Sequence, residues 1–324
     1  MLGWLFSRVF QACIVVMVMT LIIFFGISVI GDPVELLVSP EATQLERARV
    51  IASLGLDRPL WEQYFRFLGE LANGNLGTSY IYNAPPLAII IERMPATLEL
   101  AMVSVVLSCI IGIPFGVYAG LFPHTRLARS YMTLSIVGFS LPTFWIGLVF
   151  IMVFAVWLGW LPSQGRGETV EVLGFHWSFL TLDGLRHLLL PALTLSLSSI
   201  SLVFRLTVSG VKEVVGLDYI KFARAKGLSG RRVVGVHVMK NIMIPITTVI
   251  GLDMGSTIAF SVVTETIYSW PGMGKLVIDS IDVLDRPMIL AYLMVIVCLF
   301  VLINLMVDII YTLLDPRVRL GGRK

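Results

Sequence analysis

Long uninterrupted runs of apolar residues dominate the chain and determine its predicted elements. A helix needs about 20 apolar residues to cross the hydrocarbon core of a bilayer. Six stretches reach that length, at residues 9–30, 98–121, 132–157 (extended by 158–161), 188–211, 246–267 and 288–314. The first is longer than a signal-peptide core and no small-x-small cleavage site follows it, so we expect it to be retained as a span. The pattern predicts an all-α integral membrane protein with six transmembrane helices.

Short helices are predicted in the long connection between the first two spans, residues 31–96. Ser39-Pro40-Glu41 has the composition of an N-cap and first turn, and Gly55 is a suitable stop. A second helix is predicted at 61–72, closed by Asn73-Gly74, and a third apolar run covers 87–91. This helical insertion serves either as a docking platform for a partner or as a cap over the helix bundle, and the two roles are compatible.

Lysine and arginine positions predict the orientation. With a cytoplasmic N-terminus, the inner segments hold Arg8, Arg126, Arg129, Lys212, Lys221, Arg224, Lys226, Arg231, Arg232, Lys240, Arg317, Arg319, Arg323 and Lys324. The two short outer connections hold four basic residues: Arg166, Arg186, Lys275 and Arg286. This bias places both termini in the cytoplasm. The chain then divides into a cytoplasmic N-terminus with the first span (1–30), an outer helical region (31–96), a core of the five remaining spans (97–314) containing an inner loop (212–245), and a cytoplasmic tail (315–324).

Composition supports this class. The 324 residues are 57% hydrophobic and 14% charged, with a mean hydropathy of +0.89, whereas soluble domains average about 25% charged residues. A net charge of +3 is too small to indicate nucleic-acid binding. Cys13, Cys109 and Cys298 lie far apart inside apolar runs, which excludes a disulfide framework or a Cys-x-x-Cys metal pair.

Small and polar residues form stripes within the spans. Ser104, Ser108, Gly112, Gly116 and Gly120 recur every four residues, a spacing that predicts close helix packing in lipid. In the fourth and fifth spans the polar stripes contain Ser198, Ser201, Arg205, Asp253, Thr257 and Ser261. These six residues either line a polar translocation path or serve helix–helix hydrogen bonding, with Arg205 snorkelling toward the inner surface. Glu99 and Asp308, near span ends, are expected at the membrane interface.

The sequence lacks an energy source of its own. Its Gly274-Lys275 dipeptide has neither the preceding glycine nor the following hydroxyl residue of a phosphate-binding loop. The four histidines lie on separate segments without ligand spacing, and no catalytic constellation is suggested. We therefore expect no enzyme activity and no cofactor on this chain. It moves a solute down a gradient, couples to an ion, or uses energy from a partner.

A basic stretch at 216–232 separates the fourth and fifth spans. Its alanines and basic residues favour a short helix ending near Gly227, with Leu217, Ile220, Ala223 and Gly227 on one arc. Three interpretations remain open from the residues alone. The helix binds anionic lipid, the charges enforce topology, or the helix fits a cleft on a cytoplasmic protein.

Five short motifs occur along the chain: LGLDRPL (54–60), RMPATLEL (93–100), SLPTFW (140–145), DYIKFARAKGL (218–228) and YSWPGMG (268–274). In their order and topology they resemble the motifs of ABC importer permeases, specifically the B-type membrane subunits of the dipeptide, oligopeptide and nickel group. The inner loop departs from the general Glu-Ala-Ala…Gly pattern of the superfamily, because 221–223 read Lys-Phe-Ala. Of that pattern the second alanine and Gly227 are present.

The resemblance implies the function and the partners. The chain would be one of two homologous permease subunits in a bacterial or archaeal inner membrane, working with two cytoplasmic ATP-binding subunits and an extracytoplasmic solute-binding protein. ATP and Mg would be bound by those ATPases. Coupling would use Tyr219, Phe222, Ala223, Arg224, Ala225 and Gly227. Short peptides are the expected cargo, nickel or another small solute is an alternative, and an ion-coupled secondary transporter is the competing class.

Overall fold

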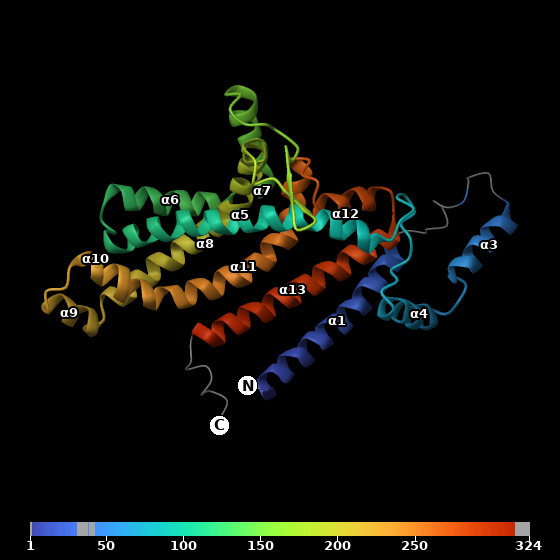
Figure 1. Ribbon diagram of the computed structural model, residues 1–324, viewed down its shortest axis with the longest axis horizontal. Coiled ribbons are helices and arrows are strands. Elements are labelled where there is room, and N and C mark those ends of the chain that lie inside the picture. The colour runs from blue at the N-terminus through green and yellow to red at the C-terminus, as the bar shows by residue number, and fades with distance from the viewer. Residues whose placement is uncertain (1, 31–37, 39–42, 315–324) are drawn as a thin grey trace. The chain divides into compact units, whose positions relative to one another are not determined.

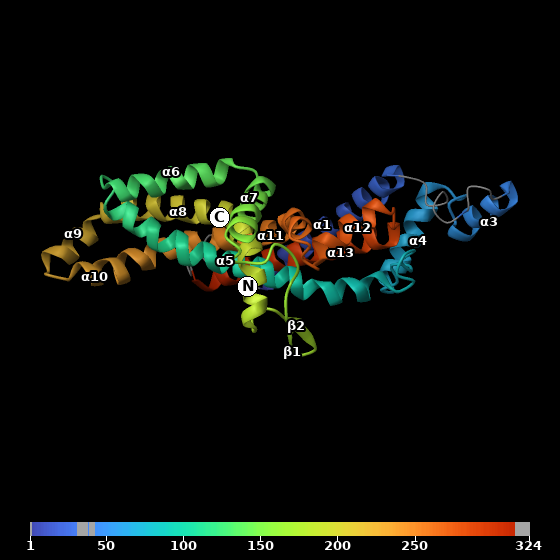
Figure 2. The same ribbon diagram turned by 90° about the horizontal axis from the view of Figure 1, so that it is seen from above.

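The computed structural model describes residues 2–30, 38 and 43–314. The chain divides into two compact units: Met1–Met94 with Gly272–Val301, and Pro95–Pro271 with Leu302–Lys324. Helices make up most of the described chain, and a short β-hairpin belongs to the second unit (Figures 1 and 2).

The first unit is built around a long N-terminal helix. Its elements are α1 (Leu2–Ile30), α3 (Gln44–Leu54), α4 (Leu60–Ala72), the start of α5 (Pro86–Leu121), α12 (Met273–Asp282) and most of α13 (Arg286–Leu314). Ile23 of α1 packs with Ile289, Met294 and Val297 of α13, and Leu71 of α4 lies against this cluster. Apolar contacts therefore hold α4 to α1 and α13.

Capping residues set the limits of the short outer helices. Thr43 and Glu46 form a capping box at the start of α3, in which the Thr43 amide donates to Glu46 Oε2 at 2.9 Å. The helix ends at Gly55, whose φ of 67° is left-handed, as the sequence predicted. The predicted start at Ser39–Glu41 lies outside the described residues. The predicted end of α4 at Asn73 is also confirmed.

α5 is longer than predicted. The sequence indicated a short helix at 87–91 and a separate span from residue 98, but one helix runs through Pro86–Leu121 and contains Pro95 and Pro114. Proline removes one backbone donor, a loss that transmembrane helices tolerate when neighbouring helices pack against them. Here Ala96 and Leu100 are fully buried in a cluster that includes Leu188 and Trp270.

The third apolar run is broken rather than continuous. It forms α6 (Arg126–Ser140), α7 (Thr143–Phe150) and a π-helical segment, η1 (Ile151–Trp157), and the two halves are bent by 109°. Pro142 explains the break: it cannot donate to the helical ladder and it pushes the preceding residue out of the α region. Leu141 is accordingly extended, with φ −85° and ψ 136°.

The second unit is assembled on α8 (Leu182–Val215) and α11 (Met239–Ile267). α5 approaches α8 closely at the predicted small-residue stripe. A Cβ added at Gly112 would lie 2.9 Å from Val203 Cγ1, at Gly116 2.6 Å from Thr207 Cβ, and at Gly120 2.7 Å from Val211 Cβ. The prediction of close packing is confirmed for these glycines, since each occupies a position where α8 leaves no room for a side chain.

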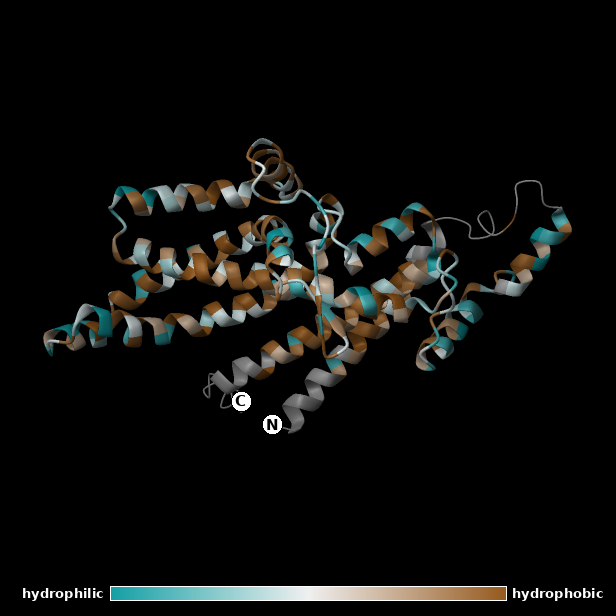
Figure 3. Ribbon diagram, turned by 45° about the horizontal axis from the view of Figure 1, so that its top comes forward, coloured by the Kyte–Doolittle hydropathy of each residue, from teal (hydrophilic) through white to brown (hydrophobic). Residues whose placement is uncertain are grey.

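Four described helices are long and apolar enough to cross a bilayer: Pro86–Leu121, Leu182–Val215, Gly230–Ile267 and Arg286–Val307. The bent pair α6 and α7 gives a fifth if it counts as one span. In the described part of α1, the apolar stretch Cys13–Gly26 is shorter than these. Hydrophobic residues run along these helices in Figure 3. The count of six spans stays a prediction.

Candidate coupling segment and polar path

The basic stretch after α8 folds as predicted into a short helix. α9 (Asp218–Ala225) follows a turn at Gly216, and Asp218 in its first turn pairs with Lys221 at 2.9 Å. The Leu228 amide bonds to the Ala223 carbonyl at 3.3 Å and the Gly227 amide to the Arg224 carbonyl at 2.9 Å. This Schellman arrangement needs a left-handed residue, and Gly227 has φ 79°. The predicted stop is confirmed.

One side of α9 is anchored in the core of its own unit. Ile220 and Ala223 are buried with Val211 and Val214 of α8 and with residues of the next elements, η2 (Val233–Val238) and α11. A short helix, α10 (Gly230–Arg232), precedes η2. In both views α9 and α10 lie together at the end of α8 (Figures 1 and 2). α9 is therefore packed against two long helices, α8 and α11.

The other side of α9 is open and mixes aromatic with basic groups. Phe222 is 61% exposed, and the Lys226 ammonium lies 4.5 Å from its ring centroid. Tyr219 is also exposed, and its hydroxyl accepts a hydrogen bond from Asn241 Nδ2 at 2.7 Å. Of the predicted coupling residues, Tyr219, Phe222, Arg224, Ala225 and Gly227 are exposed, whereas Ala223 faces the core.

The residues of the predicted polar path lie on α8 and α11 and differ in burial. Ser201, Thr257 and Ser261 are buried, while Ser198, Arg205 and Asp253 are partly exposed. Arg205 Nε donates to the Ser201 carbonyl at 3.2 Å, and the guanidinium lies 4.4 Å from the Phe139 ring centroid. Ser201 and Thr257 donate to carbonyls of their own helices.

Two acids connect these stripes to neighbouring helices. Ser199, the sequence neighbour of Ser198, donates to Asp253 and links α8 to α11. Glu265 is fully buried and accepts hydrogen bonds from Thr97 at 2.7 Å and Ser261 at 2.9 Å, which links α11 to α5. Ser199 lies outside the polar stripe read from the sequence, so only the packing reveals its contact with Asp253. Part of the stripe therefore serves helix–helix hydrogen bonding.

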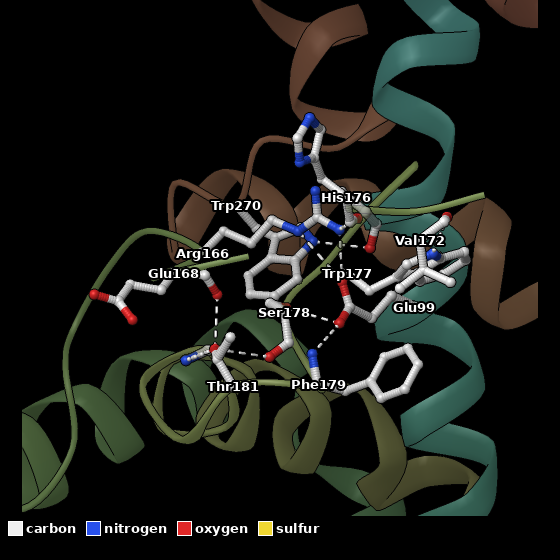
Figure 4. Close-up of polar contacts among 12 residues, drawn as sticks. Glu99, Arg166, Glu168, Val172, His176, Trp177, Ser178, Phe179, Thr181 and Trp270 are labelled. Carbon is white, nitrogen blue, oxygen red and sulfur yellow. Dashed lines mark hydrogen bonds and ion pairs between the residues drawn. The ribbon is translucent and has the colours of Figure 1, made fainter. Parts of the chain in front are cut away.

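A polar cluster that the sequence did not predict surrounds Glu99 (Figure 4). Glu99 was expected at the interface, but its side chain is 0% exposed and its Oε2 lies 2.7 Å from Arg166 Nη2. Its Oε1 accepts from Ser178 Oγ at 2.7 Å and from the Phe179 amide at 2.6 Å. These donors replace water around the buried carboxylate, and the expected position of Glu99 at the depth of the membrane interface stays a prediction.

The same cluster fastens the connection between η1 and α8. Arg166 Nη2 also donates to the His176 carbonyl at 2.6 Å, in the hairpin of β1 (Val170–Val172) and β2 (Phe175–Trp177). Thr181 Oγ1 donates to the Glu168 carbonyl at 2.8 Å, and Trp270 Nε1 donates to the Ala96 carbonyl at 2.9 Å. The sequence shows Glu99 at the start of one span and Arg166 in a later connection. It does not show that the two side chains pair, because only the fold brings them together.

Known proteins resemble this chain over most of its length. Residues 112–320 match the family described as binding-protein-dependent transport system inner membrane component, and residues 1–101 match the N-terminal family of such membrane components. A di/tripeptide transport system permease protein, DppB of Pseudomonas aeruginosa, is 38% identical over 91% of this chain and 95% of its own. The oligopeptide permease protein AppB of Bacillus subtilis is 38% identical over 89% and 90%.

A solved structure supports the same fold. The inward-facing MetNI methionine ABC transporter contains a chain that aligns with a TM-score of 0.54 at 16% identity, covering 70% of this chain and 96% of that one. Together with the apolar spanning helices, the match to both family segments decides the classification. The chain belongs to the family of binding-protein-dependent transport system inner membrane components.

Proposed function

We propose that this chain is one of the two membrane subunits of an ATP-driven importer of short peptides. The observation that carries the proposal is α9: an exposed aromatic and basic surface on a helix whose other side is built into α8 and α11. Such a helix can receive a movement from a partner and pass it to the spans. In alternating access, that movement opens the path to one side of the membrane at a time.

The proposed partners follow from the family and from the absence of an energy source in the sequence. They are a homologous second permease, two cytoplasmic ATP-binding subunits that hold ATP and Mg, and an extracytoplasmic solute-binding protein. The chain would lie in the inner membrane of a bacterium or archaeon with both termini in the cytoplasm. The names of the relatives, which include a di/tripeptide and an oligopeptide permease, support peptides as the cargo.

The proposed coupling surface consists of Tyr219, Phe222, Arg224, Ala225 and Gly227, and Ala223 connects it to the core. Phe222 would fill an apolar cleft on the ATPase, and the basic residues would meet acidic groups at its rim, which favours correct register. The translocation path is proposed to include Ser198, Ser201, Arg205, Asp253, Thr257 and Ser261. The partly exposed Ser198, Arg205 and Asp253 are the ones able to meet a solute directly.

Reconstitution tests the proposal. The chain, its second permease and the ATPases are placed in vesicles, and uptake of a labelled tripeptide is measured with the binding protein present. Accumulation is expected only with ATP and with all subunits. If the chain alone accumulates the tripeptide in response to an imposed proton or sodium gradient, the chain is a secondary transporter and the proposal is wrong.

A further inference from the structure

The outer helix α4 has an apolar arc that is only half covered within its unit. At 100° per residue, Tyr64, Phe67 and Leu71 fall on one half of this arc, and Trp61, Phe65, Leu68 and Ala72 fall on the other. Glu62, Gln63, Arg66 and Glu70 occupy the opposite side. The helix therefore has one polar direction and two adjoining apolar directions.

The first apolar half packs against α1. The Tyr64 hydroxyl lies 2.9 Å from Thr20 Oγ1, and the Phe24 ring centroid lies 5.4 Å from that of Tyr64 and 5.8 Å from that of Phe67. Leu71 joins the cluster of Ile23. These contacts fix the rotation of α4 about its own axis.

The second apolar half is open. Trp61 is 62% exposed and Phe65 is 65% exposed. No charged residue lies on this face, since the polar residues of α4 are on its other side. There Gln63, Arg66 and Glu70 line a cavity of about 560 Å³, and Arg66 pairs with Glu70 at 3.0 Å. The charges of α4 are thus turned away from Trp61 and Phe65.

With α1 as the first span, as the sequence predicts, its contacts set the depth of α4 in the membrane. α1 has 29 residues, about 43 Å at 1.5 Å per residue, so a centred α1 extends roughly 6 Å beyond each edge of a hydrocarbon core about 30 Å thick. Thr20 is ten residues from Ile30, about 15 Å along the axis. Tyr64 therefore meets α1 below the hydrocarbon edge, and α4 lies beside the last turns of α1 rather than above them.

The open face continues the exposed apolar surface of α1. Met17, Leu21 and Phe25 of α1 are exposed, and the Phe25 ring stacks 6.5 Å from that of Tyr64, next to Phe65.

We propose that α4 is an interfacial helix that inserts Trp61 and Phe65 into the bilayer leaflet at which α1 ends, the outer leaflet in the orientation proposed above. Trp and other aromatic residues favour this level of a membrane. The insertion depends on apolar contact and not on anionic lipid.

Spin labels measure the surroundings of this face. The assembled complex, with Cys13, Cys109 and Cys298 replaced by serine, is reconstituted in phosphatidylcholine nanodiscs and labelled at Trp61→Cys or Phe65→Cys. Glu62→Cys and Glu70→Cys on the polar side are matched controls. Collision rates with oxygen, relative to those with a water-soluble nickel complex, are expected to be several-fold higher at 61 and 65 than at 62 and 70.

Two results would overturn the insertion. Preferential collision with the nickel complex at all four positions means that the face is in water. Slow collision with both reagents at 61 and 65 means that a protein covers it, such as the binding protein or the second permease. As a second measurement, brominated lipid should quench the fluorescence of an inserted Trp61. The fraction of tryptophan fluorescence that this lipid quenches should therefore be lower in Trp61→Phe than in the unchanged chain, and an equal fraction contradicts the proposal. Neither readout depends on transport, so failure here is separable from failure of the proposed function.

Discussion

At the scale of single residues, the described structure depends on buried polar groups whose partners are distant in sequence. Glu99 receives hydrogen bonds from Arg166, Ser178 and the Phe179 amide, and Arg166 is itself mostly buried. A buried charge strongly lowers the stability of the folded protein when its partner is removed. The cluster therefore holds the connection of residues 162–181 to α5 with little freedom.

Replacing Glu99 with glutamine keeps an acceptor for Ser178 and Phe179 but leaves the Arg166 charge unpaired. We expect a loss of about 3–5 kcal/mol of stability, the usual cost of breaking a buried ion pair, measured as reduced resistance of the detergent-solubilised complex to denaturation. Adding Arg166→Met should restore part of the loss. Glu171→Gln, on the exposed hairpin, is the control, and equal stability of Glu99→Gln and Glu171→Gln would contradict the role of the cluster.

Gly227 offers a second test at a single position. Its φ of 79° is a conformation that costs other residues about 1–2 kcal/mol, and a β-branched residue is especially unfavourable there. Gly227→Val should change the end of α9 and lower the amount of peptide imported per ATP hydrolysed. Gly230→Val is the matched control, because Gly230 has open space around it and no positive φ. If the two variants import the same amount of peptide per ATP hydrolysed, Gly227 is not part of the coupling surface.

At the scale of elements, α9 has one side buried in its own unit and one exposed side, which we propose binds a partner. Ile220→Ala should destabilise the complex by about 2–5 kcal/mol through the cavity it creates, since Ile220 is 0% exposed. Phe222→Ala should leave stability nearly unchanged but weaken retention of the ATPase subunits and reduce peptide-stimulated ATP hydrolysis. Both effects are read from thermal unfolding and co-purification. If the ATPase subunits stay bound in Phe222→Ala and are lost only in Ile220→Ala, the partner does not bind the exposed side of α9.

The contact of α5 with α8 predicts a different kind of defect. A Cβ added at Gly116 would lie 2.6 Å from Thr207 Cβ and 2.9 Å from the Phe204 carbonyl. The backbone of α8 cannot move away from this contact without disturbing the packing of the helix. Gly116→Val should therefore lower the yield of folded protein, with a cost of at least about 1–3 kcal/mol. Gly26→Val on α1, where an added Cβ would meet no atom of another segment within 4 Å, should be tolerated. Comparable yields of the two variants would show that the helices can separate without penalty.

The sequence correctly predicted helix ends and close helix contacts wherever these depend only on residues near one another in the chain. Gly55, Gly227 and the Gly112–Gly116–Gly120 spacing each follow from backbone conformation or close approach, and the structure agrees. Pro142 and Pro95 show the limit of such rules. Pro142 lies inside an apolar run and breaks it by 109°, whereas Pro95, between Arg93 and Glu99, lies within a continuous helix. Glu99 and Ser199 could not be assigned because their partners lie 67 and 54 residues away.

At the scale of the whole molecule, the length of α8 separates two functional regions of the second unit. The 162–181 connection precedes its first turn and α9 follows its last. Its 34 residues span about 51 Å, more than the roughly 40–45 Å of a bilayer with its headgroups. The hairpin and α9 should therefore lie on opposite sides of the membrane, with the basic α9 in the cytoplasm.

Thiol labelling of a cysteine-free chain tests this arrangement. Leu173→Cys is at the hairpin tip, where Leu173 is 93% exposed, and Lys226→Cys is at the exposed end of α9. In intact cells with a permeable outer envelope, a membrane-impermeant maleimide should label Leu173→Cys and leave Lys226→Cys unlabelled until the inner membrane is opened. Because α8 is long enough to cross only once, labelling of both positions from the same side cannot be reconciled with α8 as a span. Labelling in the reverse order would keep the span but invert the orientation, and α9 could then no longer reach a cytoplasmic ATPase.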